Sequence, residues 1–233
     1  MGTSKGYIAP TRPEWSASKR SVSTFLRNRD TDSKAKAVSK FAEAMSTGTS
    51  SASAFSSAAG NVLAFAKGLA TNGLNNTLSL FGRDDLIGKE PDEILNALLD
   101  QFTNSGATIE DSLAADALSS AFDELNISSS DDLAHVDLND LLREMIIAFI
   151  NFSFDLHYHE KIGQGRTPAE TKDILTDIHK YIANALHDKL TPAEIGKIDL
   201  SSLGDASLVS SMLHDAYSIC MDYYGDSNIS DFG

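Results

Sequence analysis

The sequence predicts an all-α protein, a multi-helix bundle preceded by an extended N-terminal tail. Three observations support this fold class. Apolar residues recur every three or four positions along much of the chain after residue 32, and several segments begin with helix-capping patterns. No segment shows a convincing strand alternation, apart from the ambiguous residues 152–158. We therefore expect an extended basic tail over residues 1–32 and one helical domain over residues 33–233.

The predicted tail contains turn-forming and charged residues without a sustained apolar period, so we expect it to be extended or disordered when alone. Residues 1–40 hold nine basic and three acidic residues, a charge of about +6, whereas the rest of the chain carries about −20. Large apolar groups such as Tyr7 and Trp15 indicate docking. A basic tail could fold onto its own acidic body or enter an acidic groove on a partner. Nucleic acid is a third, weaker option, because the acidic body would repel it.

The first helices of the body are predicted from apolar spacing. Residues 33–45 and 52–70 follow a helical period, and a linker rich in Ser, Thr and Gly separates them at residues 46–51. Further along, Pro91 suits a first helical position, and Thr108 is a candidate N-cap. These signals predict successive helices joined by short connections.

Two stronger helix starts follow in the second half of the chain. Residues 167–170 and 191–194 each read Thr-Pro-Ala-Glu, which combines a capping residue, proline at the first helical position and glutamate at the third. A last helix is predicted over residues 205–223. The ten-residue apolar stretch at 145–154 predicts a buried core helix, because it is too short to span a bilayer.

Charge and cysteine content exclude several classes of function. A net charge of −14 disfavours non-specific binding to nucleic acid or to an anionic membrane, so neither is an expected partner. The lone Cys220 cannot form an internal disulfide, and the N-terminus has no apolar signal core. The predicted location is the cytoplasm.

One segment could hold a metal ion. Residues 155–160 bring two imidazoles and two carboxylates close together, and these are competent zinc or iron ligands. On a helix, however, His157 and His159 would diverge by about 200°. A polar helix end is the favoured interpretation. A metal-dependent enzyme using Asp155, His157 and His159, with His179 as a further candidate ligand, is the alternative.

Other catalytic patterns are weak. Residues 82–89 resemble a phosphate-binding loop but have five intervening residues where that motif has four, so they predict a turn between helices. Cys220 lies in an apolar stretch and is predicted to be a buried, inert thiol. We predict no catalytic residue, no metal and no cofactor.

The N-terminus offers one reactive group. Met1 precedes Gly2, and a residue that small normally permits removal of the initiator methionine. The α-amine this exposes would have a pKa of about 8 and be partly unprotonated near neutral pH. Gly2 is therefore a suitable acceptor for acylation. Myristoylation is a poor match, because the pattern requires Ser or Thr where this chain has Gly6.

The opening residues 1–7, Met-Gly-Thr-Ser-Lys-Gly-Tyr, are followed by Pro10, Pro13 and Trp15, and the body contains Leu-Phe-Gly-Arg-Asp-Asp-Leu-Ile-Gly-Lys at residues 80–89. In these features the chain resembles the QatB family of bacterial Qat anti-phage defence systems. The resemblance implies a non-enzymatic defence component that acts with an ATPase, a QueC-like deazapurine enzyme and a TatD-like nuclease.

The same resemblance implies a modification. The QueC-like enzyme would bind this protein and join a deazaguanine group to Gly2 through an amide, with Thr3, Ser4 and Tyr7 threading its active site. Pro10 and Trp15 complete the expected partner-binding set. A plain helical scaffold that its tail anchors to a partner is the remaining alternative.

Overall fold

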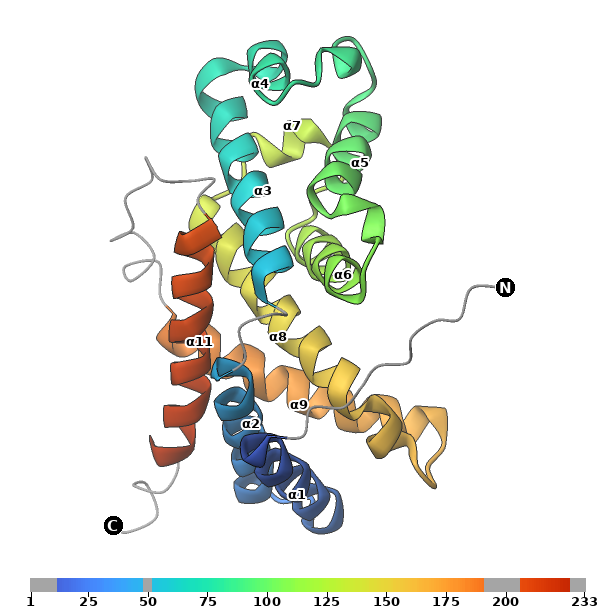
Figure 1. The fold of residues 1–233 in the computed structure, drawn as a ribbon, viewed down its shortest axis with the longest axis vertical. Coiled ribbons are helices and arrows are strands. Elements are labelled where there is room, and N and C mark those ends of the chain that lie inside the picture. Colours follow the sequence, from blue (N-terminus) through green and yellow to red (C-terminus); the bar gives the residue numbers. More distant parts are fainter. Residues whose placement is uncertain (1–11, 48–51, 191–205, 227–233) are drawn as a thin grey trace.

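Figure 1 shows the fold in a computed structural model, which describes residues 12–47, 52–190 and 206–226. Within these ranges nearly all residues are helical and no strand occurs. The predicted all-α bundle is confirmed. The helices, in chain order, are α1 (Pro13–Asn28), α2 (Thr31–Ser46), α3 (Ala52–Asn72), α4 (Leu74–Leu80), η1 (Asp84–Leu86), α5 (Pro91–Phe102), η2 (Asn104–Gly106), α6 (Ile109–Glu124), α7 (Ser130–Leu133), α8 (Leu138–Gly163), α9 (Pro168–Lys189) and α11 (Ala206–Asp226).

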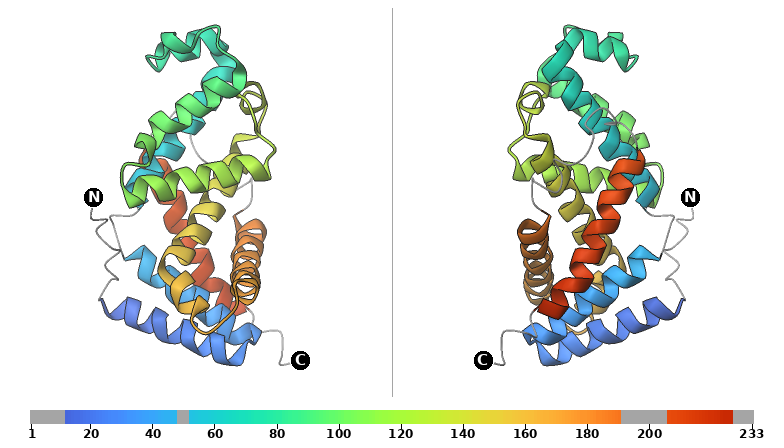
Figure 2. Two further views of the ribbon diagram at one scale, coloured as in Figure 1. Left: turned by 90° about the vertical axis from the view of Figure 1, so that its right-hand side faces the viewer. Right: turned by 90° about the vertical axis from the view of Figure 1, so that its left-hand side faces the viewer.

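The longest helix, α8, runs diagonally through the molecule and connects its two ends (Figure 1). At one end, α1 and α2 form a hairpin beside α8 and α9; at the other, α3 to α7 form a lobe. The side views of Figure 2 show α11 lying along α2 and α3, which ties the hairpin to the lobe. The two ends therefore belong to one packed body.

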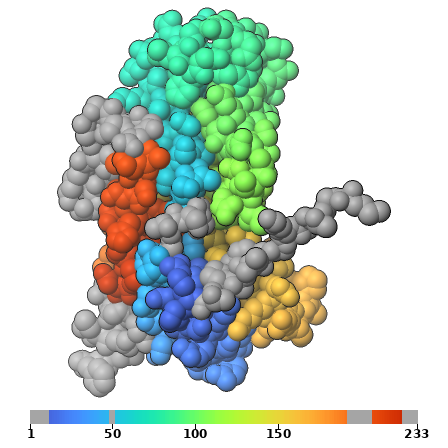
Figure 3. Space-filling model, in the orientation of Figure 1, coloured from blue at the N-terminus to red at the C-terminus, as the bar shows by residue number. Residues whose placement is uncertain are grey.

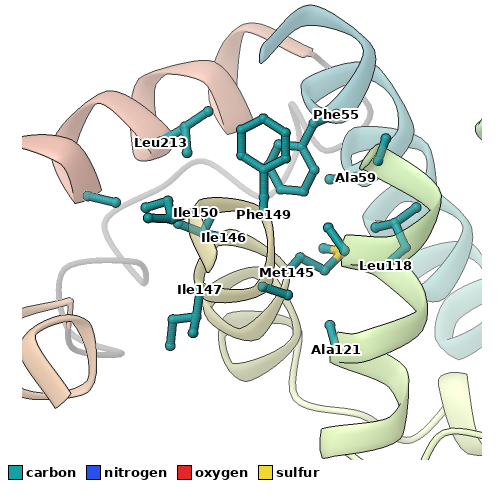
Figure 4. Packing of buried hydrophobic residues seen from close by; sticks show 14 of the residues in the cluster. Phe55, Ala59, Leu118, Ala121, Met145, Ile146, Ile147, Phe149, Ile150 and Leu213 are labelled. Atoms are coloured by element: carbon teal, nitrogen blue, oxygen red, sulfur yellow. The ribbon is translucent and has the colours of Figure 1, made fainter. Parts of the chain in front are cut away.

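The middle of α8 forms the centre of the core. The apolar stretch at residues 145–154 is helical and mostly buried, as predicted, and the ambiguous residues 152–158 continue the same helix. Figure 4 shows Phe149 facing Phe55 of α3, with ring centroids 4.2 Å apart in a stacked arrangement. Leu118 of α6 and Leu213 of α11 close around the same point.

The predicted caps start the helices as expected. Thr108 and Thr167 each accept a hydrogen bond from the backbone N–H three residues later, at 3.1 Å and 3.3 Å. Asp111 and Glu170 accept the threonine N–H in return, which completes two capping boxes. Pro91 opens α5. The third predicted start, at residues 191–194, lies outside the described residues.

The extended tail predicted through residue 32 is wrong for residues 13–28, which form α1. Proline at the first helical position and the spacing of Trp15, Val22 and Phe25 place three large groups on one face. We interpreted the intervening serines as turn formers, yet Ser18 is buried because its small side chain lets α1 approach the body closely. Residues 1–11 of the predicted tail lie outside the described residues.

The segment at residues 82–89 is a turn, as predicted. Gly82 and Gly88 adopt φ angles of +68° and +83°, which glycine adopts readily. Arg83 donates to both carboxylate oxygens of Asp85 at 2.9 Å and also reaches Gln101 of α5 at 2.9 Å. These bonds fix the connection between α4 and α5 and leave no phosphate-binding loop there.

In the described part of the chain, no helix combines the length and apolarity needed to cross a bilayer.

Candidate functional site

The structure fixes the position of α1, the first helix of the described chain. Trp15 of α1 is only 4% exposed and lies against the imidazole of His157, with ring centroids 4.1 Å apart. One turn later, the Tyr158 hydroxyl donates to Ser18 Oγ at 2.5 Å. Both contacts join α1 to α8. Because aromatic packing and a buried hydrogen bond act together, α1 is an integral part of the body.

A further contact holds the start of the described chain. One guanidinium nitrogen of Arg12 donates to the carbonyl oxygen of Thr47 at the end of α2, at 2.6 Å. Residues 1–11 are therefore attached to an anchored site on the α1–α2 hairpin.

The predicted partner-binding residues divide into two groups. Gly2, Thr3, Ser4, Tyr7 and Pro10 lie outside the described residues. Trp15, which we expected in the same set, instead lies in the interior between His157 and Phe41. Its position suits anchoring of α1, and the structure does not present it to a partner.

His157 belongs to this anchor. Burial, with a further contribution from the nearby charge of Lys19, lowers its pKa to about 4. At neutral pH its imidazole is therefore uncharged, which is compatible with its place beneath Trp15. It serves packing rather than proton transfer at pH 7.

Asp155 lies on the opposite side of α8 and faces α9. Its Oδ1 is 2.8 Å from Nε2 of His179, and both residues line an open hollow of about 610 Å³ together with the exposed His159. His157 takes no part in this hollow. Asp155, His157 and His159 thus do not converge, and the described residues contain no cluster of three or more His, Cys, Asp or Glu side chains that could hold a metal ion.

A second pair repeats this arrangement further along the α8–α9 seam. Nε2 of His187 is 2.9 Å from Oε1 of Glu144, beside a hollow of about 220 Å³ that Asn151 also lines. Sequence reasoning grouped Asp155 and His179 only as candidate metal ligands, and it missed the Glu144–His187 pair. The eight-residue spacing of His179 and His187 places them on one face of α9, but their partners become apparent only once α9 packs antiparallel to α8.

Cys220 does not have the environment of a catalytic nucleophile. The thiol is 1% exposed, and burial raises its pKa to about 12. It is protonated at neutral pH, as the prediction of an inert buried thiol requires.

Comparison with protein families gives a match over most of this body. The model of the family described as "Qat anti-phage system associated protein QatB" matches residues 44–220. The chain belongs to the QatB family. Membership makes it a component of the Qat anti-phage system. No curated protein and no solved structure matched the chain.

The QatB match covers the end of α2 and extends to Cys220 in α11. It includes the central helix α8 and the whole lobe. Residues 1–43, with α1 and the predicted modification site, lie outside the matched range. Family membership therefore rests on the helical body, and the role of the N-terminal residues has to be argued separately.

Proposed function

We propose that this QatB-family protein is a non-enzymatic defence component that binds a QueC-like partner enzyme and is its substrate, with Gly2 as the acceptor of a deazaguanine group. Membership of an anti-phage system supports the first part. The observation that supports the second is the anchored helix α1, because the chain after Gly2 leads directly into it. The body acts as a carrier of its own N-terminus.

The chemistry proposed at Gly2 is amide formation. The unprotonated α-amine donates its electron pair to an activated acyl carbon of the deazaguanine group, the activating group leaves with its bonding electrons, and the nitrogen loses a proton. The partner supplies the activation. An α-amine has a pKa of about 8, against about 10.4 for lysine, so more of it is reactive at neutral pH.

The proposal names one direct partner and two further ones. The QueC-like enzyme makes the direct contact, through Thr3, Ser4, Tyr7 and Pro10 next to the acceptor. The Qat ATPase and the TatD-like nuclease are proposed as further partners within the system, and the whole is proposed to work in the cytoplasm. Neither a membrane nor direct contact with nucleic acid is part of the proposal.

Intact-mass spectrometry after co-expression with the QueC-like enzyme tests the acceptor. We expect a mass increase of one deazaguanine acyl group that tandem fragmentation places on Gly2. Gly2→Leu retains the initiator methionine and removes the glycine amine, so it should abolish the increase, while Gly6→Ala serves as the matched control and should keep it.

An unmodified wild-type N-terminus in the presence of active partner would contradict the proposal. Binding of the partner that needs residues 2–11 but tolerates Gly2→Leu, without any modification, would instead favour the plain scaffold.

A further inference from the structure

The outward side of α1 carries basic side chains that form no ion pair within the described part of the chain. Lys19, Arg20 and Arg27 make no ion pair with any other described residue, and the last two are exposed. Arg29, at the end of the helix, is exposed as well and lies over the Phe25 ring at 5.2 Å. Arg20 and Arg27 therefore face solvent or a partner, whereas Arg29 also lines a hollow with Glu170 and Asp173 of α9.

A fifth cation joins them where α1 crosses α8. Trp15 packs on His157 and Ser18 bonds Tyr158, which brings Lys19 close to Lys161, about one helical turn further along each helix. Burial and the charge of Lys19 lower the pKa of Lys161. Two like charges close together repel each other, and an approaching anion relieves that repulsion. We call Lys19, Arg20, Arg27, Arg29 and Lys161 the α1 basic face.

Other acidic groups lie near this face. Glu14 has one carboxyl oxygen fully buried, and Asp30 accepts a hydrogen bond from the Ser33 N–H as the N-cap of α2. Because Glu170 and Asp173 of α9 lie beside Arg29, the exposed cations that carry the argument are Arg20 and Arg27. Figure 3 shows α1 at the surface of one end of the molecule, with α4 and α5 at the far end. The basic face is thus a cationic patch, exposed at its arginines and half-buried at Lys19 and Lys161, on a protein of net charge −14.

We propose that the α1 basic face is the docking surface for an acidic patch on the enzyme that modifies Gly2. This inference rests on the proposed function and adds that the enzyme recognises a folded surface as well as the N-terminal residues. Nine residues lie between Gly2 and Arg12, and the ten extended steps from one Cα to the other span at most about 35 Å. An enzyme that holds Gly2 in its active site is therefore close enough to touch α1.

An acidic protein surface fits this face better than nucleic acid does. The segment from residue 90 to residue 142 contains 13 acidic residues and no lysine or arginine, so this part of the molecule repels a phosphate backbone. The aromatic rings of α1, Trp15 and Phe25, are buried and cannot stack on bases. Arginine pairs with carboxylates through two parallel hydrogen bonds, which suits Arg20 and Arg27.

Charge reversal on α1 tests the proposal. The variant R20E/R27E changes two exposed side chains, and K172E/K180E on α9 is the matched control, because it makes the same change in net charge at exposed lysines that do not belong to the α1 basic face. We would measure affinity for the QueC-like enzyme by calorimetry and the rate of modification by intact mass. Thermal unfolding would verify that both variants are folded.

We expect R20E/R27E to weaken binding about tenfold or more and the control to remain within about twofold of wild type. Wild-type affinity should fall between about 50 and about 300 mM salt. KM for modification should rise with kcat unchanged, because neither arginine touches the reacting atoms. Equal affinities for R20E/R27E and the control would overturn the proposal.

The two proposals fail in different ways. If Gly2 stays unmodified while R20E/R27E still loses binding, the docking surface stands and the modification does not. If both variants are modified at the wild-type KM, the docking surface is wrong and the modification stands. Binding of a short DNA or RNA duplex to wild type that R20E/R27E abolishes, with enzyme binding unchanged, would overturn docking in favour of nucleic acid.

Discussion

At one end of the molecule, residues 12–47 carry eight basic and four acidic residues, whereas at the other end residues 90–142 carry 13 acidic residues and no lysine or arginine. Both ends nevertheless contribute to one apolar core, through Trp15 in the hairpin and Leu98 in the lobe. Packing is thus continuous while charge is segregated. Because burial does not require this charge pattern, the segregation points to interactions with other molecules, and the anchored basic end is the one that carries the N-terminus.

The largest effects should come from core truncations that separate the two ends. Trp15→Ala is expected to cost about 3–5 kcal/mol and Leu98→Ala about 2–5 kcal/mol of unfolding free energy, because each leaves a cavity in packed surroundings. Urea unfolding measures both. Native-state hydrogen exchange should show faster exchange in α1 for the first and in α5 for the second.

Identical exchange patterns in these two variants would show that α1 and α5 open together, and would contradict independent opening of the two ends.

Acid should weaken the basic end through His157. Its pKa is about 4 in the folded protein, against 6.5 for an ordinary histidine, so the unfolded chain binds a proton first as pH falls. Stability should therefore decrease between about pH 6.5 and about pH 4, by on the order of 3 kcal/mol. Carboxylates whose pKa is lowered in the folded protein, such as Glu170, reduce stability only below about pH 4.5, where they begin to be protonated in the unfolded chain.

The measurement is the urea midpoint as a function of pH for wild type and for His157→Phe, which keeps a ring beneath Trp15 but cannot titrate. A wild-type midpoint that stays level from pH 6.5 to pH 4 would contradict the buried, neutral imidazole.

A smaller effect is expected from the hydrogen bond that joins α1 to α8. Tyr158→Phe removes the donor to Ser18 and should cost about 1 kcal/mol. A double-mutant cycle with Ser18→Ala measures the coupling, which should account for most of that cost. A coupling near zero would show that aromatic packing alone holds α1 in place.

The smallest effect is expected at the tip of the lobe. Leu80 is 74% exposed and Ile87 42%, so Leu80→Ser and Ile87→Ser should each change unfolding free energy by no more than about 0.5 kcal/mol. Thermal unfolding measures this. A loss of several kcal/mol would mean that these side chains contribute to the core and that the tip is not an exposed surface.

The sequence allowed prediction of the all-α class, the boxes at Thr108 and Thr167, and the core helix at residues 145–154, because these depend on local spacing. The prediction failed at α1, because its serines were interpreted as turn formers. The segment is a helix whose buried face depends on packing against α8.

The site was harder to predict. The divergence of His157 and His159 follows from helix geometry and was foreseen, but the pairs Asp155–His179 and Glu144–His187 each join residues at least 24 positions apart. Such pairs require the packing of α8 on α9, which no local pattern encodes.

Hydrogen exchange of the protein with and without the QueC-like enzyme tests the central claim most directly, because it maps the contact surface onto both ends at once. The account predicts protection of residues 13–28, with no change over residues 91–124. Protection confined to residues 91–124, with α1 exchanging as in the free protein, would contradict it.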